Sequence, residues 1–548
     1  MKRYFILYAI LFSVYPVLFL YSYNNGYLLI NELYRPLAIT LLGATILLGL
    51  LRLISRSSDI AAALTAFWGF WLFSYGHLLR ADEIFSGRLI ESMVRQALWV
   101  WLAIFVLGAL VILRLRKRLI GARTALFVIA VVLVGMTSWS IARFESHRVR
   151  LRALQPKKSA SVASQQNQQD TSNYPDIYYI ILDGYARPDV FEELYGESNE
   201  EFVKFLEKKG FIIAKESRAN YFKTMYSLAT SLNMCYLDEL APKSGNESWD
   251  EKQAWVLMKK NALYNLLWQK GYKLMAGGAE VKPNAQLDVD NMKEKGRAKS
   301  IRPMPDFSWV VLEMTPLLVF SHLFDPTKQA QFEVDHERYN LYRSSILKGF
   351  DRILKVKESK SPRFVFSLLS STHPPFVFYR NGAPIRQTKR YNCNDGVKGL
   401  ADNVNETQAS YLKHYPEQYL FVSAKLQQTL EKLLAKKSSR PKVIILQSDH
   451  GSSGYFNWYD PPKSYVRERM SIMNAFYFSD GARPPIYDST TPVNTFRIIS
   501  NYYFKTDFPL LKDRSYLPNS GAYDFLDVTD KMGKLPADKL PKPDNTIK

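Results

Sequence analysis

The sequence predicts a bundle of five transmembrane helices followed by an α/β domain with a central, mostly parallel sheet. Two observations carry this expectation. Apolar runs long enough to cross a bilayer fill the first 145 residues, and short buried-type strands alternate with helical segments after residue 173. The chain has 548 residues, of which 47% are hydrophobic, so it has room for several domains and is neither disordered nor fibrous in composition.

Five apolar runs, each about as long as a helix that spans the hydrocarbon core, precede residue 145. They cover residues 4–21, 36–53, 60–79, 97–113 and 125–141. Lys2 and Arg3 precede the first run as they would in a signal peptide, but no small-residue cleavage site follows it. We therefore expect the first run to be retained as a membrane span.

The excess of positive charge concentrates in this apolar part of the chain. The formal net charge is +21, and residues 1–173 hold 19 Lys and Arg against 7 Asp and Glu. With a cytoplasmic N-terminus, the inside segments carry nine Lys and Arg and the two short outside loops carry four, in agreement with the positive-inside rule. Basic residues in such places suit anionic lipid headgroups, and no nucleic-acid-binding motif occurs, so we expect a membrane and no nucleic acid as partner.

The five spans place everything after residue 145 outside the cytoplasm. The predicted organisation is a transmembrane domain over residues 1–145, a basic and polar juxtamembrane linker over 146–173, and a second domain over 174–548. We expect the basic part of the linker to lie along the outer leaflet, and its polar end cannot bury a core. Only two cysteines occur, Cys235 and Cys393, which excludes a disulfide-dense scaffold but leaves one bridge between them open.

Three short apolar runs predict strands that are buried on both faces of a parallel sheet. They cover residues 176–182, 364–369 and 443–446. Leucines at helical spacing predict a helix over 417–437, and Pro492 is placed to begin another helix. Alternating strands and helices indicate a doubly wound sheet, in which ligands bind beyond the carboxyl ends of the strands.

Polar residues directly follow two of these strands. Asp183 comes after the first strand, and Asp449 and His450 come after the run VIILQS. If the two strands are parallel neighbours, two carboxylates and an imidazole converge at one edge of the sheet, where they suit one divalent cation. Asp183 by itself is equally consistent with a cap or a loop stabiliser, and it is the combination that favours metal ligation.

The segment NYFKTMYSLATSLNMCY, residues 220–236, offers four serine and threonine hydroxyl groups, on Thr224, Ser227, Thr230 and Ser231. A hydroxyl at a helix N-terminus beside a metal is a feasible nucleophile, because the cation lowers its pKa and the helix dipole favours developing negative charge. The alternative is an N-capping threonine ahead of a helix that packs through small residues. The pattern alone does not choose among the four hydroxyls.

Taken in order, LDG, NYFKTMYSLATSLNM, THPPFVF, QSDHG, NAFYF and TPVNTFR resemble the alkaline-phosphatase/sulfatase superfamily over residues 174–520. More narrowly, they resemble its membrane-anchored branch, which includes lipoteichoic acid synthase and the lipid A phosphoethanolamine transferases. The resemblance implies that residues 174–548 form an alkaline-phosphatase-like catalytic domain. The five-span anchor matches this branch as well.

The resemblance also implies roles for individual residues. Asp183, Asp449 and His450 stand at positions of metal ligands. Thr224 stands at the position of the nucleophilic threonine, which also touches the metal. His373, in the run THPPF, resembles a histidine that contacts the transferred phosphate or the leaving group; the alternative is a loop histidine packed beside two prolines.

The activity that the resemblance implies is metal-dependent transfer of a phospho-alcohol headgroup, phosphoethanolamine or phosphoglycerol. The donor would be a phospholipid, the acceptor a cell-envelope glycan or glycolipid, and the cofactor one divalent cation, Mn²⁺, Zn²⁺ or Mg²⁺. The enzyme would lie in the bacterial inner membrane with its catalytic domain on the periplasmic or extracellular side. Two alternatives stay open: a phosphodiesterase or phosphatase that uses water as acceptor, and a non-catalytic membrane protein that keeps the fold.

Two departures from the wider superfamily narrow the activity. A two-zinc phosphatase needs a further histidine well after the Asp-His pair, and His450 is the last histidine in the chain. Sulfatases convert a Cys or Ser within C/S-x-P-x-R to formylglycine, and the nearest match here, residues 439–443, lacks the final arginine. We therefore expect a single metal site and no formylglycine-dependent sulfatase activity.

Overall fold

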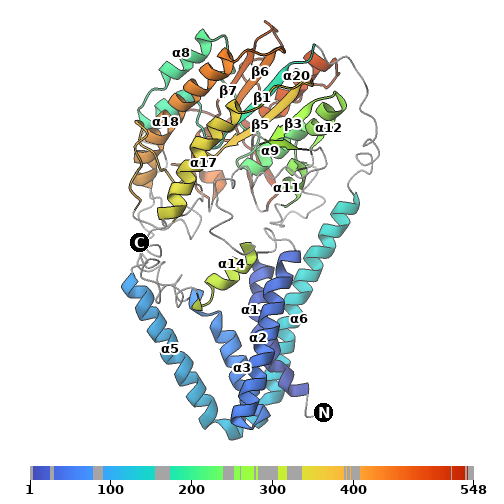
Figure 1. Cartoon of the computed structure of the whole chain (residues 1–548), viewed down its shortest axis with the longest axis vertical. Helices are drawn as coiled ribbons and strands as arrows, with labels where there is room; N and C mark the ends of the chain where they lie inside the picture. The colour runs from blue at the N-terminus through green and yellow to red at the C-terminus, as the bar shows by residue number, and fades with distance from the viewer. Residues whose placement is uncertain are drawn as a thin grey trace. The chain divides into compact units, whose positions relative to one another are not determined.

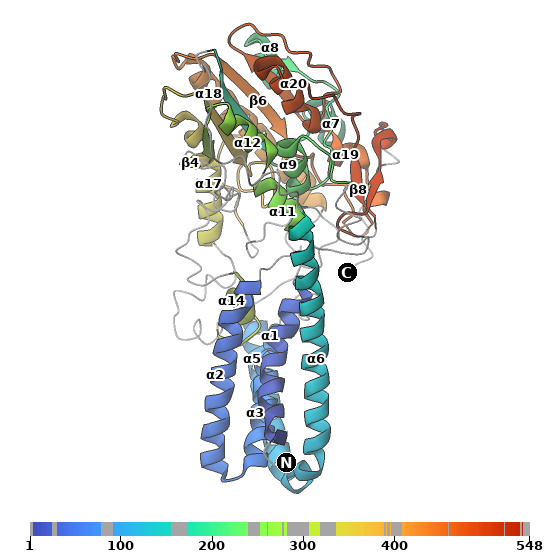
Figure 2. The same ribbon diagram turned by 90° about the vertical axis from the view of Figure 1, so that its right-hand side faces the viewer.

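A computed structural model of the chain shows a group of long helices and a sheet covered by helices, which are two separate compact units (Figures 1 and 2). The helical unit comprises Met1–Pro156 and Ser300–Val334, and the sheet unit comprises Lys157–Lys299 and Asp335–Lys548. The structure describes residues 4–24, 30–77, 91–154, 173–238, 252–259, 261–276, 279–281, 306–317, 336–387, 391, 395, 408–458, 460–519, 521–536 and 540.

Five long helices and a shorter one make up the described part of the helical unit. They are α1 (Tyr8–Tyr23), α2 (Ile30–Ser55), α3 (Ser58–Leu72), α5 (Glu91–Arg114), α6 (Arg116–Leu154) and α14 (Asp306–Glu313), with a 3₁₀ turn, η1 (Tyr4–Leu7), ahead of α1. By length and composition, two stretches can cross a membrane: α2 and residues Gly121–Ser146 of α6. The helices Tyr8–Tyr23 and Leu98–Arg114 are apolar but shorter.

A helical region with two membrane-capable helices therefore precedes the sheet, and the other three predicted spans stay predictions. The third predicted span falls partly on α3, and residues 78–90 lie outside the described residues. α6 continues to Leu154, so the first part of the predicted linker is helical, whereas residues 155–172 are not described. Cys393 also lies outside the described residues, which leaves the bridge to Cys235 untested.

The short helix α14 belongs to the helical unit although it comes from the middle of the second predicted domain. Phe307 and Val311 of α14, and Met314 directly after it, are buried in one cluster with residues of α1 that include Val17 and Leu18. This burial of apolar side chains is the physical reason that α14 groups with the N-terminal helices.

The sheet unit is built on a seven-stranded sheet with the strand order β2-β7-β6-β1-β5-β3-β4. The strands are β1 (Asp176–Leu182), β2 (Ile212–Ile213), β3 (Lys273–Ala276), β4 (Ala279–Val281), β5 (Arg363–Leu369), β6 (Lys442–Ser448) and β7 (Asn474–Phe478), and β8 (Tyr516–Pro518) and β9 (Phe525–Asp527) form a separate pair. The four central strands β6, β1, β5 and β3 are parallel, and β7, β2 and β4 join through antiparallel pairs. The predicted α/β domain with a mostly parallel sheet is confirmed.

Helices cover both faces of this sheet. They are α7 (Pro188–Tyr195), α8 (Glu200–Lys208), α9 (Thr224–Asn233), α11 (Lys252–Lys259), α12 (Ala262–Gln269), α17 (His336–Leu354), α18 (Gln408–Ala435), α19 (Val466–Met470) and α20 (Pro492–Phe504), with 3₁₀ turns η4 (Pro461–Lys463) and η5 (Thr529–Lys531). Figures 1 and 2 place α17 and α18 on one side of the sheet and α9, α12 and α20 on the other. Every residue of β1, β5 and β6 is buried, as expected of strands with helices on both faces.

A buried ion pair joins the first residues of β1 and β5. Asp176 and Arg363 are 1% and 4% exposed. One carboxylate oxygen of Asp176 accepts a hydrogen bond from the backbone N–H of Arg363 at 2.8 Å, and the other pairs with the Arg363 guanidinium. The pair therefore contributes to the register between the two central strands.

Replacing Asp176 with alanine is expected to lower the free energy of unfolding of the sheet unit by about 3–5 kcal/mol, because the Arg363 charge is left buried without its counterion. The midpoint of denaturant unfolding in detergent solution measures this. Glu200→Ala is the control, since Glu200 and Lys204 form an exposed pair at 2.9 Å whose loss costs about 1 kcal/mol or less. Equal losses in the two variants would contradict the prediction.

Candidate active site

The carboxyl ends of three neighbouring parallel strands bring the predicted site residues to one edge of the sheet. Leu182 of β1 is paired with Ser448 of β6 on one side and with Leu369 of β5 on the other. Asp183 and Asp449 are the residues that follow Leu182 and Ser448. The prediction that these two strands are parallel neighbours is thus confirmed, and their convergence follows from the register.

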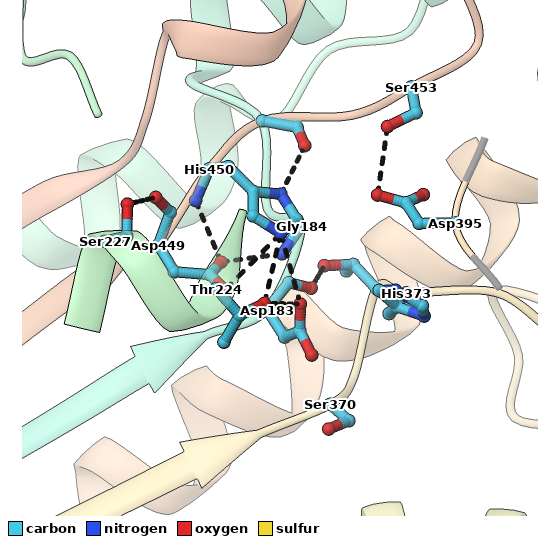
Figure 3. A network of polar contacts seen from close by, with 12 residues as sticks. Asp183, Gly184, Thr224, Ser227, Ser370, His373, Asp395, Asp449, His450 and Ser453 are labelled. Atoms are coloured by element: carbon cyan, nitrogen blue, oxygen red, sulfur yellow. Dashed lines mark hydrogen bonds and ion pairs between the residues drawn. The ribbon is translucent and has the colours of Figure 1, made fainter. Parts of the chain in front are cut away.

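Four side chains form a tight cluster at this edge (Figure 3). The hydroxyl oxygen Oγ1 of Thr224 lies 3.4 Å from Oδ1 of Asp183 and 3.3 Å from Nε2 of His450. The same His450 nitrogen lies 3.6 Å from Oδ1 of Asp183 and 3.4 Å from Oδ2 of Asp449. Asp183, Asp449 and His450 are at most 1% exposed, whereas Thr224 is half-buried, so solvent reaches the cluster from the Thr224 side.

Backbone groups hold the two carboxylates in place. Oδ1 of Asp449 accepts hydrogen bonds from the N–H groups of Gly184 at 3.1 Å and of His450 at 2.8 Å, which turns Oδ2 toward the cluster. Gly184 has a φ of +74°, a conformation that favours glycine at this turn. Thr372 donates a hydrogen bond to the Asp183 carbonyl at 2.7 Å and so ties the loop after β5 to the end of β1.

His450 presents a lone pair to the cluster. Its Nδ1 lies 2.9 Å from the carbonyl oxygen of Gly451, which only accepts hydrogen bonds, so Nδ1 carries the proton and Nε2 is bare. Burial, assisted by the positive charge of Arg469, lowers the pKa of His450 to about 3. The ring is therefore neutral at physiological pH, which is the form that coordinates a metal.

Of the four hydroxyl groups in the segment 220–236, only Thr224 belongs to this cluster. Thr224 is the first residue of α9, at the positive end of the helix dipole. Ser227 is buried and donates to the Asp449 carbonyl at 2.6 Å. Thr230 and Ser231 are fully buried further along the helix. The geometry therefore selects Thr224 among the four hydroxyls, which the sequence pattern alone does not distinguish.

The spacing of the donor atoms fits a bound cation. Metal–ligand bonds of about 2.0–2.2 Å in a tetrahedral site separate the ligand atoms by about 3.3–3.6 Å. The donor atoms of Thr224, Asp183, Asp449 and His450 define six separations, and the four that involve Thr224 or His450 with a neighbour given above are 3.3, 3.4, 3.4 and 3.6 Å. Ligand atoms of Asp183, Asp449 and His450 all lie within 4.8 Å of one another. Three oxygens and one imidazole nitrogen suit a divalent cation.

His373 lies in the loop after β5, next to Thr372 and beside Asp183 in Figure 3. Its Nδ1 lies 2.8 Å from the Pro374 carbonyl, and its own carbonyl accepts a hydrogen bond from the Tyr342 hydroxyl at 3.0 Å. The hydrogen bond from the neighbouring Thr372 to the Asp183 carbonyl places this loop at the same edge of the sheet as the cluster. Its contact with phosphate stays a prediction.

Several residues that support the site are not apparent from the sequence. Tyr415 of α18 donates to the Gly184 carbonyl at 2.9 Å and accepts from the Ala186 N–H at 3.0 Å, which holds the turn after β1. Arg469 and Asp395 form a buried ion pair beside the loop that follows His450. No local pattern marks these residues, because each acts on a partner far away in the chain.

Solved structures that resemble the chain do so at low identity. The C-terminal periplasmic domain of EptC from Escherichia coli, in complex with Zn, is 15% identical, with 68% of this chain and 97% of that chain covered and a TM-score of 0.40. The lipooligosaccharide phosphoethanolamine transferase A (EptA) from Neisseria meningitidis is 12% identical, with 91% and 95% covered and a TM-score of 0.35. The phosphonate monoester hydrolase of Agrobacterium radiobacter is 11% identical, with 63% and 80% covered and a TM-score of 0.36.

No curated protein sequence matches the chain. A family model does: the one described as Sulfatase matches residues 175–496, which is more than half of the chain. The match begins at β1, includes the residues of the cluster and ends in α20. The chain therefore belongs to the sulfatase family, within the alkaline-phosphatase/sulfatase superfamily.

Proposed function

We propose that the protein is a membrane-anchored, metal-dependent transferase of phospho-alcohol headgroups. It takes phosphoethanolamine or phosphoglycerol from a phospholipid and passes it to a cell-envelope glycan or glycolipid through a phosphothreonine on Thr224. The observation that carries this proposal is the position of the Thr224 hydroxyl, within 3.4 Å of both Asp183 and His450 at the start of α9. The absence of a formylglycine motif from the sequence argues against sulfate ester hydrolysis.

The cation site would consist of Asp183, Thr224, Asp449 and His450. When bound there, a divalent cation supplies positive charge that lowers the pKa of a coordinated hydroxyl and offsets negative charge on the phosphoryl oxygens. Asp183 and Asp449 bring two negative charges, and neutral His450 brings a nitrogen lone pair. Zn²⁺ is the first ion to test because carboxylate oxygens and an imidazole nitrogen are among its usual ligands, and Mn²⁺ and Mg²⁺ are the alternatives.

In the first half-reaction, the Oγ1 atom of Thr224 forms a bond with the phosphorus of the lipid. The bond between phosphorus and the diacylglycerol oxygen breaks, and diacylglycerol leaves with the proton that the threonine gives up. A phosphodiester between Thr224 and the headgroup alcohol remains. The N–H groups in the first turn of α9 favour the negative charge that gathers on the phosphoryl oxygens, and His373 is the proposed contact for the phosphate or the leaving group.

In the second half-reaction, a hydroxyl of the glycan or glycolipid acceptor forms the new bond with phosphorus. The bond to Oγ1 breaks, and Thr224 recovers its proton. Water in place of this acceptor would make the protein a hydrolase. The same residues serve both half-reactions, because each is a displacement at phosphorus with Oγ1 of Thr224 on one side.

A membrane anchor suits a lipid donor, because two-dimensional confinement raises the concentration of the donor at the site. α2 and residues Gly121–Ser146 of α6 supply two membrane-capable helices, and three further apolar runs complete the proposed five spans. With a cytoplasmic N-terminus, these spans put the catalytic domain on the periplasmic or extracellular side of the bacterial inner membrane.

The test is the mass of the peptide that carries Thr224, taken from protein purified out of its native membranes. A phospho-alcohol adduct on Thr224 that is absent from His450→Ala is the expected result, and its mass identifies the headgroup. Turnover of a soluble nitrophenyl phosphodiester without acceptor, and without any adduct, would instead support the hydrolase. An unmodified Thr224 with lipid supplied and acceptor withheld, together with no turnover, would support a non-catalytic role.

A further inference from the structure

The largest fully buried side chain of the sheet unit among the described residues is a charged one, Arg469. It lies on the short helix α19 and is 1% exposed. Burying a guanidinium is costly unless it is paired and its donors are satisfied, so its position needs an account. The partners of Arg469 lie on both sides of the candidate active site.

One guanidinium connects the nucleophile segment to the histidine loop. Nε of Arg469 donates to the Phe222 carbonyl at 2.7 Å, two residues before Thr224. Nη1 donates to the Gly451 carbonyl at 3.2 Å, directly after His450. That same Gly451 carbonyl accepts the hydrogen bond from Nδ1 of His450. Arg469 thus contacts the backbone that leads into α9 and the group that orients the imidazole.

The charge of Arg469 is compensated within the protein. Its Nη1 pairs with the carboxylate of Asp395, which also accepts a hydrogen bond from Ser453 at 3.0 Å. Burial opposes ionisation of Asp395, but the charge of Arg469, the nearby His373 and His450, and the hydrogen bond from Arg469 together lower the pKa of this carboxyl. The rings of Phe456 and Trp458 lie 5.5 and 5.2 Å from the guanidinium carbon. Arg469 is therefore held as a fixed ion pair and has no surface for substrate.

A second bond between the same two segments comes from Ser227, which donates to the Asp449 carbonyl at 2.6 Å. A single bond leaves two segments free to rotate about it, whereas two bonds at separate points fix their orientation. In the nucleophile segment, Arg469 bonds to Phe222, which precedes Thr224, whereas Ser227 follows Thr224. In the histidine loop, Arg469 bonds to Gly451, which follows His450, whereas Asp449 precedes His450. Thr224 and His450, whose Oγ1 and Nε2 atoms lie 3.3 Å apart, are thus each flanked in sequence by the hydrogen bonds of Ser227 and of Arg469.

We infer that Arg469 is a positioning residue that holds Thr224 and His450 at the separation required for cation binding and for attack on phosphorus. The part of this inference that concerns attack rests on the proposed function. Arg469 touches neither substrate nor reacting atoms and acts through the Phe222 and Gly451 carbonyls and Nδ1 of His450. Groups that orient the ligands of a metal in this way typically change metal affinity or activity by about 10–100-fold when they are replaced.

The decisive variant is Arg469→Lys, which keeps the charge but replaces the planar fork with a single ammonium group. A lysine cannot reach both carbonyls and Asp395 in the same geometry. We expect the rate of adduct formation on Thr224 and the affinity for Zn²⁺ each to fall by about 10–100-fold. The KM for the lipid donor is expected to stay unchanged, because Arg469 is buried away from substrate.

The matched control is Arg467→Lys on the same helix. Arg467 pairs with Asp189 at 2.7 Å and with Glu193 at 3.1 Å, and it donates to the Met532 carbonyl at 3.3 Å; within the described residues these side-chain bonds do not reach the loop after His450. The full-length protein in phospholipid nanodiscs is used for all measurements. They are the intact-mass rate of adduct formation, titration calorimetry with Zn²⁺ in the absence of substrate, and the thermal midpoint. Arg467→Lys is expected to leave the first two unchanged.

An adduct rate and a Zn²⁺ affinity within twofold of the wild type in folded Arg469→Lys would overturn the inference, as would equal losses in Arg467→Lys. If Arg469→Lys does not fold, Asp395→Asn replaces it, since it removes the counterion that holds the guanidinium. Losses in the same direction support the inference, and wild-type values overturn it. If the wild type itself forms no adduct, the proposed function fails, while the Zn²⁺ affinities still decide the role of Arg469.

Discussion

Replacing Thr224 with alanine is expected to abolish the covalent adduct and to lower turnover by about 10⁴-fold or more, the scale on which loss of a nucleophile acts. The methyl group of alanine leaves the start of α9 intact but supplies no oxygen to attack phosphorus. One donor atom of the cation site, 3.3 Å from Nε2 of His450, disappears as well. Intact-mass measurement of the adduct and release of radiolabelled headgroup from phospholipid check both effects.

Two further variants give this prediction its controls. Thr224→Ser keeps the hydroxyl and should retain the adduct. Thr230→Val, on the same helix, should leave turnover unchanged, because Oγ1 of Thr230 is buried with no hydrogen-bond partner among the described residues. If turnover survives in Thr224→Ala and is lost in Thr230→Val, the nucleophile is Thr230 and the assignment of Thr224 is wrong.

Replacing Asp449 with asparagine is expected to remove the bound cation and to lower turnover by about 10³-fold, since charge stabilisation by such a metal is worth several kcal/mol. An asparagine still accepts the hydrogen bonds from Gly184 and His450 through one oxygen. The atom that faces Nε2 of His450 changes from a carboxylate oxygen to an NH₂ group, which cannot ligate a metal. The variant therefore separates metal binding from folding.

Metal content after purification and the thermal midpoint with added Zn²⁺ measure this effect. Zn²⁺ at about 100 times its dissociation constant stabilises the wild type by about 2.7 kcal/mol and should leave the variant unchanged. A chelator should bring the wild type to the activity of the variant. Asp480→Asn is the control, because this carboxylate is exposed, lies outside the cluster, and accepts hydrogen bonds from the Tyr503 hydroxyl and the Ala482 N–H. Retained metal in Asp449→Asn would contradict the assignment of the site.

The central strands β1, β5 and β6 can be predicted from the local sequence. The run DIYYIIL predicts β1 with the bounds that the structure has, and the other two predicted strands differ from β5 and β6 by one or two residues at their ends. A strand that is covered on both faces must be apolar throughout. Its two ends can therefore be recognised from the ends of an uninterrupted apolar run. The polar residues that follow such strands, Asp183 and Asp449, then fall at the edge where ligands bind.

The start of helix α18 could not be predicted from the local sequence. The sequence predicts that this helix begins at residue 417. In the structure the helix begins at Gln408 and contains Pro416. A proline inside a helix costs about 3 kcal/mol. The buried rings of Tyr411 and Tyr415, and the two hydrogen bonds that Tyr415 makes to the turn after β1, offset that cost. These contacts join residues more than 200 positions apart, which no local pattern reveals.

The sequence by itself determined the class of the α/β domain, the ends of three central strands to within two residues, and Asp183, Asp449 and His450 as candidate metal ligands, because hydrophobic period and strand length are local properties. The local pattern left four hydroxyls open and the family resemblance selected Thr224, but only the tertiary structure showed that Thr224 lies in the cluster, which tautomer His450 adopts, and that Arg469 contacts both halves of the site. The Arg469 bonds reach Phe222 and Asp395 over 247 and 74 residues of chain. Buried charges and hydrogen bonds take partners by position in space, so only the packed fold identifies them.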